Sequence, residues 1–382
     1  MKKNLKPLEE DVSSSDKLKA LVQSEILLQG PISFSRYMQL ALYHPNYGYY
    51  QVKKNIFGSD GDFVTSPNIS TMFAETFLND FKVIFASSSK NILELGAGNG
   101  AFCQSVMQLF DEKGVDIEQY YIIESSPTLV KSCQQRLKEN LSSAAYSKIN
   151  WLKSLPSSFK GVVFMNEFFD ALPVDIFVKK DDKLFEKCVS IKNDKFIWVL
   201  SEMKGNQYFE NLPIHTFPAD YTFEFSNLYK YWVDTLKKTL QQGAIYIVDY
   251  GFHAKELFHP DRSAGTLMCY LNHQSHSDPL INIGQQDISC HVNFSLLKNL
   301  FGNDVQIEGF VSQANYLINA NILDILKSYN PKDVVNYSKK TAELNMLISP
   351  AEMGDLIKVM SVSKEVDIQL HGFSKNDRSF LL

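Results

Sequence analysis

Apolar positions in this sequence follow one pattern before Asn91 and another after it. After Asn91, short apolar segments alternate with longer segments whose apolar residues recur at helical spacing. The predicted strands are 92–95, 120–124, 149–152, 161–165 and 244–250. The predicted helices of this region are one that ends at Phe110, 128–140 and 228–240. Because successive parallel strands need crossover connections, this alternation predicts an α/β fold with a mainly parallel, doubly wound sheet.

The N-terminal region shows no alternation of strands and helices. Its polar start is followed by apolar residues at helical spacing, which predicts helices over 18–28, 34–42 and 69–85. Turn-rich segments, among them 44–48 and 58–62, separate these helices. We therefore predict that residues 1–86 form a polar tail and a helical cap in front of the sheet.

A second interruption lies between Pro173 and Phe225. Three segments with alternating apolar residues are separated by polar turns, and they are 176–178, 187–191 and 196–200. This pattern predicts an antiparallel arm over 174–226, inserted between the two halves of the core. The predicted core halves, 87–173 and 227–382, include late strands at 305–311 and 356–362 and a helix at 321–327 in a C-terminal extension.

Composition and charge exclude several classes of protein. The 382 residues carry a formal net charge of -5, so a nucleic acid is not expected as the main partner. The 5 cysteines form no C-x-x-C pair, and the scattered histidines complete no ligand set, so we expect no metal site. No apolar run has the length of a membrane span, and the N-terminus does not resemble a secretion signal. A cytoplasmic location is expected.

A glycine-rich turn, 94–100, follows the first predicted strand. Ligands bind at the carboxyl ends of parallel strands, and the following helix offers free backbone N–H groups to an anionic group. Gly96 permits the tight turn, and Gly98 lets the backbone approach a ligand closely. Glu124 ends the second predicted strand, where its carboxylate can accept hydrogen bonds from two ribose hydroxyls.

The turn by itself is compatible with two cofactors. Gly96, Gly98 and Ala101 satisfy the dinucleotide fingerprint, whose third position tolerates alanine. Gly96, Gly98 and Gly100, preceded by Glu94, fit a site for S-adenosylmethionine better. A glycine turn that only packs a helix on a strand remains a third interpretation, and Glu124 argues against it.

The fourth predicted strand delivers polar residues to the same sheet edge. It continues into Asn166 and Glu167, and Asp170 follows. Methyl transfer depends mainly on positioning and electrostatics, and carboxylates would hold an acceptor that carries a guanidinium. Glu167 and Asp170 are therefore candidate catalytic residues. The alternative is a helix N-cap in which Asn166 caps and the acidic residues favour the helix dipole.

Asp62 lies in a polar turn, 61–67, and is a third candidate catalytic residue; its alternative role is to cap the next helix. The tyrosines at 43, 47, 49 and 50 are expected to be packing residues rather than a cage for a methylated cation. His253, His259 and His291 are expected in loops or on the surface.

Taken together, these residues resemble the MidA-type methyltransferases, whose mitochondrial counterpart is a complex I assembly factor. The resemblance is carried by segments in family order: 30–34, 41–50, 61–67, the glycine turn, 124–127, 166–173, 249–251, 265–273 and 287–292. It implies a class I, Rossmann-like methyltransferase fold and S-adenosylmethionine as cofactor. It also implies a cofactor site made of Gly96, Ala97, Gly98, Gly100, Glu124, Asn166 and Glu167.

The resemblance further implies a protein substrate, since mitochondrial members symmetrically dimethylate an arginine of a complex I subunit. The sequence departs from the family pattern at Ala97 and Asn99 in the turn, and at Asn68 and Asn293, where carboxylates are usual. Arginine methylation of a protein is the function that we expect. Two alternatives stay open at this point: a dinucleotide-dependent oxidoreductase, and an assembly chaperone that binds the cofactor without turnover. The sequence does not predict the oligomeric state.

Overall fold

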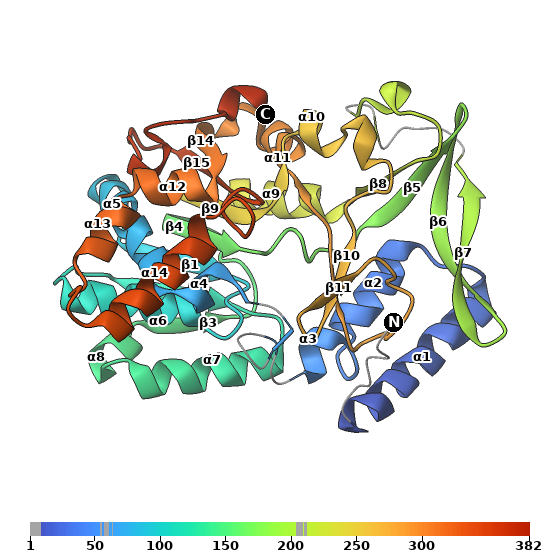
Figure 1. Ribbon diagram of the computed structural model, residues 1–382, viewed down its shortest axis with the longest axis horizontal. Coiled ribbons are helices and arrows are strands. Elements are labelled where there is room, and N and C mark those ends of the chain that lie inside the picture. Colours follow the sequence, from blue (N-terminus) through green and yellow to red (C-terminus); the bar gives the residue numbers. More distant parts are fainter. Residues whose placement is uncertain (1–8, 54–55, 57–60, 63, 204–208, 210–211) are drawn as a thin grey trace.

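A mixed sheet of eight strands organises the part of the molecule at the left of Figure 1. The computed structural model describes residues 9–53, 56, 61–62, 64–203, 209 and 212–382. The strand order is β14-β15-β9-β4-β1-β2-β3, and β13 pairs with the end of β9. The strands are β1 (Asn91–Leu95), β2 (Gln119–Ile123), β3 (Ile149–Leu152), β4 (Phe159–Asn166), β9 (Leu240–Phe252), β13 (Val292–Asn293), β14 (Gln306–Ser312) and β15 (Ile357–Lys364).

The strand directions confirm the predicted fold class. Strands β3, β2, β1, β4 and β9 are parallel to one another, and β15 is antiparallel to both β9 and β14. The five strands predicted in the core and both late strands are present, with ends that differ by a few residues. The carboxyl ends of β1, β2, β4 and β9 therefore meet at one edge, where a ligand site is expected.

Helices cover both faces of this sheet. Ile92 of β1 and Phe164 of β4 face one layer, and Leu93 and Val163 face the other, because successive side chains of a strand point to opposite sides. The first layer consists of α5 (Thr71–Ser87), α6 (Ala101–Glu112), α7 (Pro127–Asn140), α8 (Ser143–Tyr146), α12 (Gln313–Asn319), α13 (Ile322–Lys327) and α14 (Val334–Ile348). The second layer consists of α9 (Leu228–Thr239) and α11 (Phe294–Phe301).

Helix α5 packs against the sheet, although the sequence pattern assigns 69–85 to the N-terminal cap. Its Phe77 makes ring contacts with Phe164 of β4 and Tyr246 of β9. Apolar spacing identifies a helix and its apolar face, but it does not say which surface that face will cover. The division of the chain into the parts 1–86, 87–173, 174–226 and 227–382 remains a prediction.

The inserted arm is an antiparallel sheet, as predicted. Its strands, in the order β7-β6-β5-β8, are β5 (Asp175–Lys180), β6 (Lys183–Lys192), β7 (Lys195–Glu202) and β8 (Tyr221–Phe225). Figure 1 shows β5, β6 and β7 at the right of the view, beside the N-terminal helices. The N-terminal helices are α1 (Glu9–Gln29), α2 (Phe34–Tyr43), α3 (Tyr49–Val52) and the short α4 (Ser66–Ile69).

A second hydrophobic core joins the N-terminal helices to the arm and to a small sheet. Phe34 and Tyr37 of α2 lie in this core with Val189 of β6 and Cys269 of β10. The small antiparallel sheet, which the sequence pattern does not predict, consists of β10 (Met268–Leu271), β11 (Gln274–His276) and β12 (Asp287–Ser289). Within the described part of the chain, no helix is long and apolar enough to span a membrane.

Candidate active site

The glycine turn connects β1 to α6 with left-handed backbone at three glycines. Gly96, Gly98 and Gly100 have φ angles of 70°, 56° and 79°, which residues with a Cβ rarely adopt. A Cβ at Gly100 would lie 2.4 Å from Sγ of Cys133 on α7, so the turn packs closely against that helix. Helix α6 therefore starts at the sheet edge, directly after the carboxyl end of β1, and the N–H of its first residue, Ala101, donates to Oδ1 of Asn99 at 3.3 Å.

Glu124 is held at the end of β2 by two backbone hydrogen bonds. The N–H of Gly98 donates to its Oε2 at 3.0 Å, and the N–H of Ser126 donates to its Oε1 at 2.9 Å. Burial raises the pKa of Glu124, and these backbone donors oppose that shift. Each carboxylate oxygen keeps acceptor capacity, because a carboxylate oxygen can take more than one hydrogen bond.

A cavity of about 230 Å³ opens beside the turn, and we call it the glycine-turn cavity. It is lined by Tyr43, Tyr50, Thr65, Pro67, Asn68, Glu94, Gly96, Ala97, Gly98, Asn99, Ala101, Phe102, Ile123, Glu124, Ser125, Leu129, Asn166, Glu167, Phe168, Ala171, Leu172 and Trp232. Among the described residues, Oδ1 of Asn166 is buried there without a hydrogen-bond partner. A buried unpaired acceptor and a carboxylate at the end of β2 fit a cofactor that carries hydroxyl and amino groups.

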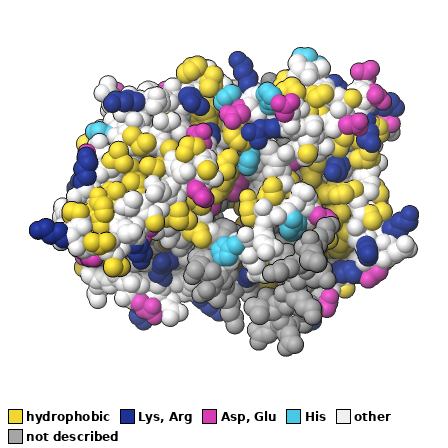
Figure 2. Space-filling model, in the orientation of Figure 1, with side chains coloured by type: hydrophobic (Ala, Val, Ile, Leu, Met, Phe, Trp, Pro, Cys, Tyr) yellow, Lys and Arg dark blue, Asp and Glu magenta, His cyan; other side chains and the backbone are white. Residues whose placement is uncertain are grey.

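A second cavity, of about 300 Å³, shares Tyr50, Glu167 and Ala171 with the first one. We call it the acidic cavity, because four carboxylates line it, and these are Asp62, Glu167, Asp170 and Asp287. The remaining lining residues are Val64, Tyr250, Thr266, Met268, Tyr270, His273, Ser275, Ser289, His291 and Met353. Figure 2 shows that the face seen in Figure 1 is hollowed near its centre, with acidic and hydrophobic side chains beside the hollow.

Glu167 lies where the two cavities meet, on unusual backbone. Its φ angle is 51°, and its N–H donates to the carbonyl of Val248 at 2.8 Å. Asp249 of β9 accepts from the N–H groups of Phe168 and Phe169 at 3.0 and 2.8 Å, which fixes the turn after Glu167. Left-handed backbone at a residue other than glycine is uncommon and is found at functional sites.

The carboxyl groups of the acidic cavity have raised pKa values. Burial, followed by the charge of Asp170, raises the pKa of Glu167 to about 8. Burial raises the pKa of Asp287 to about 6, against the hydrogen bond that Tyr50 Oη donates to it at 2.6 Å. Burial and the charges of Asp249 and Asp287 raise the pKa of Asp170, whose Oδ1 is buried without a partner among the described residues. This concentration of acidic groups therefore favours a cationic ligand.

Asp62 lines the same cavity, but its oxygens are already occupied. Its carboxylate accepts from Tyr49 Oη at 2.5 Å and from the N–H of Asn272 at 2.7 Å. Lys53 makes an ion pair with the same carboxylate, and Asp62 is 1% exposed. Its environment thus differs from that of Glu167, Asp170 and Asp287, for which no ion pair with a described cation is found.

The structure brings most of the predicted site residues together. Gly96, Ala97, Gly98, Glu124, Asn166 and Glu167 line the glycine-turn cavity, whereas Gly100 lies behind the turn against Cys133. The helix-capping alternative for 166–173 is wrong, because no helix starts in that segment. The turn 61–67 does precede a helix, and Thr65 is the N-cap residue of α4, whereas Asp62 does not cap that helix.

Sequence patterns miss several residues of the site. Asp287 and Tyr50 contribute to the acidic cavity; both lie in segments that carry the family resemblance, but neither is predicted as a site residue. His291 lies in a loop, as predicted, but it also lines this cavity, and its Nδ1 is buried without a partner among the described residues. Burial, with the charges of Arg262 and Lys358, lowers the pKa of His291 to about 4. No described group of three His, Cys, Asp or Glu residues could hold a metal ion.

The residues that depart from the family pattern make contacts close to their own positions. Asn99 Nδ2 donates to Oδ1 of Asn68 at 2.8 Å, so two of the unusual residues contact each other, across the rim of the glycine-turn cavity. Asn293 caps α11 by accepting from the N–H of Leu296 at 3.0 Å. It does not line the acidic cavity, so its missing carboxylate does not change that site.

Comparisons with known proteins agree with this geometry. Residues 72–311 match the model of the Methyltransf_28 family, which describes S-adenosyl-L-methionine-dependent methyltransferases. The mitochondrial protein arginine methyltransferase NDUFAF7 of Danio rerio is 28% identical over 371 residues, covering 89% of this chain and 85% of that protein. The human protein of that name is 27% identical over 383 residues, with coverage of 91% and 84%.

A crystal structure of a protein from Burkholderia thailandensis, bound to S-adenosyl-homocysteine, superposes with a TM-score of 0.95 at 33% sequence identity. The match covers 99% of this chain and 100% of that one. A native structure from the same organism matches with a TM-score of 0.90. The cofactor is therefore S-adenosylmethionine, and the dinucleotide alternative is set aside. The chain belongs to the Methyltransf_28 family of S-adenosyl-L-methionine-dependent methyltransferases, the MidA-type enzymes of the class I fold.

Proposed function

We propose that this methyltransferase modifies an arginine side chain of a protein. The observation that carries the proposal is the contact between the two cavities: the acidic cavity meets the glycine-turn cavity at Glu167. A cationic acceptor held by the carboxylates would thus lie next to the cofactor. The curated relatives named protein arginine methyltransferases support the same acceptor.

A guanidinium fits the acidic cavity better than a neutral acceptor. It is planar and always charged, and it can form paired hydrogen bonds with carboxylates. Glu167, Asp170 and Asp287 have raised pKa values because they are buried near one another. A bound guanidinium would stabilise their ionised forms and so offset the cost of burying them. Tyr50, Tyr250 and Tyr270 add ring faces and hydroxyl groups to the same walls.

The chain's own residues position the acceptor and handle one proton. S-adenosylmethionine supplies a methyl group that is already activated on a sulfonium. Glu167 and Asp170 would hold and orient the guanidinium, which is the main requirement of this reaction. As the acceptor nitrogen gains the methyl group it loses a proton, and Glu167, with a pKa of about 8, is suited to accept it.

The choice of partner rests on the family resemblance. A subunit of respiratory complex I, or a similar protein, is the acceptor to test first, and symmetric dimethylation is the expected product. The cytoplasmic location expected from the sequence remains a prediction. The relatives reported above are mitochondrial proteins by name.

Labelled donor added to a cell extract tests the proposal. The extract should lack the endogenous protein, and purified wild type should then transfer label to a discrete protein band. Acid hydrolysis of that band should release labelled methylarginines. Glu167→Gln should lower the incorporation about 100-fold, because a positioned acid–base group contributes at least that much. Glu112→Gln, on an exposed part of α6, is the matched control and should behave like wild type.

The alternatives give different results in this assay. Label in methyllysine or in a base-labile ester would show that the acceptor is not arginine. If the protein binds the donor in calorimetry but labels no protein, the assembly chaperone becomes the better interpretation, and the proposed enzyme activity is wrong.

A further inference from the structure

One wall of the acidic cavity is a hairpin made of β10 and β11. Met268, Tyr270, His273 and Ser275 of this hairpin line the cavity. The hairpin turns over two residues, Asn272 and His273, whose φ angles are 50° and 58°. Two residues with positive φ are typical of a tight hairpin turn, and its backbone N–H groups are then available to outside acceptors. The position of this wall sets the width of the space for an acceptor side chain.

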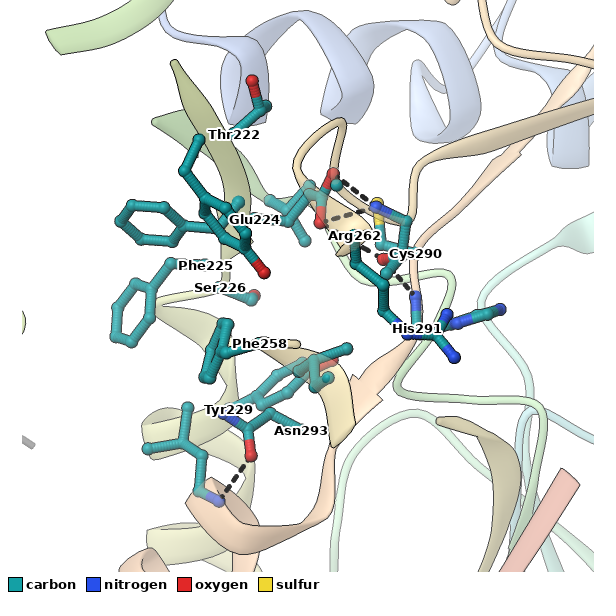
Figure 3. A pocket seen from close by; sticks show the side chains of 17 residues that line it. Thr222, Glu224, Phe225, Ser226, Tyr229, Phe258, Arg262, Cys290, His291 and Asn293 are labelled. Atoms are coloured by element: carbon teal, nitrogen blue, oxygen red, sulfur yellow. Dashed lines mark hydrogen bonds between the residues drawn. The ribbon is translucent and has the colours of Figure 1, made fainter. Parts of the chain in front are cut away.

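The base of the hairpin is fixed by Glu224 of β8, whose carboxylate is labelled in Figure 3 with its hydrogen bonds as dashed lines. Oε1 of Glu224 accepts from the N–H of Thr266 at 3.0 Å, and Oε2 accepts from its hydroxyl at 3.2 Å. Thr266 Oγ1 in turn accepts from the N–H of His291 at 3.0 Å. The inserted arm thus holds the chain just before β10.

The tip of the hairpin is fixed by Asp62. The N–H of Asn272 donates to Oδ1 of Asp62 at 2.7 Å, and the N–H of His273 donates to its backbone carbonyl at 3.1 Å. Tyr49 Oη and the ammonium of Lys53 bind the other oxygen of the same carboxylate. Asp62 therefore joins the hairpin tip to α3, although Asp62 and Asn272 are 210 residues apart in the sequence.

The charge of Asp62 is already balanced, which separates it from the other carboxylates of the cavity. Lys53 neutralises it, and its carboxylate receives three donors, so little acceptor capacity remains for a guanidinium. We propose that Asp62 is a positioning residue that holds the β10–β11 hairpin as a wall of the acidic cavity and thereby sets the affinity for the acceptor. This inference rests on the proposed function only for the identity of that acceptor.

Hydrogen exchange on the donor-bound protein tests the contact without any acceptor. In Asp62→Ala, backbone amides of 268–276 should exchange at least about tenfold faster than in wild type, which corresponds to the loss of one or two hydrogen bonds. Asp62→Asn keeps an oxygen that can accept from Asn272, so it should stay within a few-fold of wild type. Asp278→Asn, at an exposed site on the following loop, is the matched control. Unchanged exchange in Asp62→Ala would overturn the proposal.

Kinetics with an acceptor peptide separate positioning from catalysis. Asp62→Ala should raise KM about tenfold or more with a small change in kcat, and Asp62→Asn should restore most of the affinity. A loss of kcat in Asp62→Asn as large as that in Glu167→Gln, with KM unchanged, would make Asp62 catalytic and refute the proposal. If Asp62→Ala does not fold, Tyr49→Phe serves as the second variant, because it removes one of the hydrogen bonds to Asp62. Amide exchange in 268–276 should then be faster than in wild type. An unchanged exchange rate would count against the proposal. If neither the wild type nor any variant methylates arginine, the proposed function is wrong, but the hydrogen-exchange experiment still decides the role of Asp62.

Discussion

At the scale of single residues, the carboxylates of the acidic cavity differ in what balances their charge. Lys53 balances Asp62, whereas Glu167, Asp170 and Asp287 are buried near one another and have raised pKa values. The ion-paired Asp62 therefore has a structural role, whereas the three carboxyl groups without an ion pair can bind a cationic ligand. Residue type alone does not reveal this difference, because all four are acidic residues in turns or short strands.

Glu167 should give the activity a pH dependence. Its pKa in the free enzyme is about 8, so below that pH the carboxyl group is mostly protonated and holds a guanidinium weakly. We therefore expect kcat/KM for an arginine peptide to rise with pH and to level off above about 8, because kcat/KM reports the free enzyme. The acceptor keeps its charge throughout, since a guanidinium does not titrate in this range.

Steady-state rates between pH 6 and pH 9 measure this dependence, and those limits are roughly the range where the carboxyl group titrates. Glu167→Gln should abolish the part of the rise that is centred near the pKa of Glu167. A flat profile in the wild type, or the same rise in the variant, would contradict the role assigned to Glu167.

At the scale of elements, the packing of the glycine turn on α7 supports the cofactor site. Gly100 has left-handed backbone and leaves no room for a Cβ beside Cys133. The neighbouring Asn99–Asn68 hydrogen bond connects the same turn to α4. The turn is therefore held from two sides before the cofactor arrives, which lowers the cost of ordering it on binding.

Gly100→Ala should destabilise the fold by about 2 kcal/mol or more, because it adds backbone strain and a steric overlap. Cys133→Ala should relieve the overlap but not the strain, so the double variant should recover only part of the stability. Urea unfolding of the two single variants and the double variant measures both contributions in a double-mutant cycle. Additive losses would mean that the overlap with Cys133 is absent.

At the scale of the whole molecule, two hydrophobic cores come together around the ligand site. The sheet and its helices supply most of the glycine-turn cavity, while the small sheet with its flanking loops and the turn after β4 supply most of the acidic cavity. Tyr50 connects the two cavities. Its hydroxyl donates to Asp287 of the acidic cavity, and its backbone carbonyl accepts from Ser126 Oγ at 2.5 Å, close to Glu124 of the glycine-turn cavity. Binding at one cavity can thus order the walls of the other.

Cofactor binding should stabilise the whole chain. S-adenosyl-homocysteine at 100 times its Kd should add about 2.7 kcal/mol to the free energy of unfolding and raise Tm. Glu124→Ala should reduce this shift at the same concentration, and NAD(H) should produce none. Thermal unfolding monitored by calorimetry measures the shifts. Full stabilisation of Glu124→Ala would remove Glu124 from the cofactor site.

The sequence by itself determines the parallel sheet and the glycine turn, and its local pattern narrows the cofactor to S-adenosylmethionine or a dinucleotide. These features depend on residues that are close together in the sequence. Apolar periodicity identifies the strands and helices, and glycines mark the turn because they adopt left-handed backbone without strain. Only the tertiary structure decides which carboxylates face a ligand. Asp62 and Asn272, or Tyr50 and Asp287, meet through the packing of elements more than two hundred residues apart. No local pattern encodes such contacts, so Asp287 and His291 are missed, and the different environments of Asp62 and Glu167 become visible only in the folded chain.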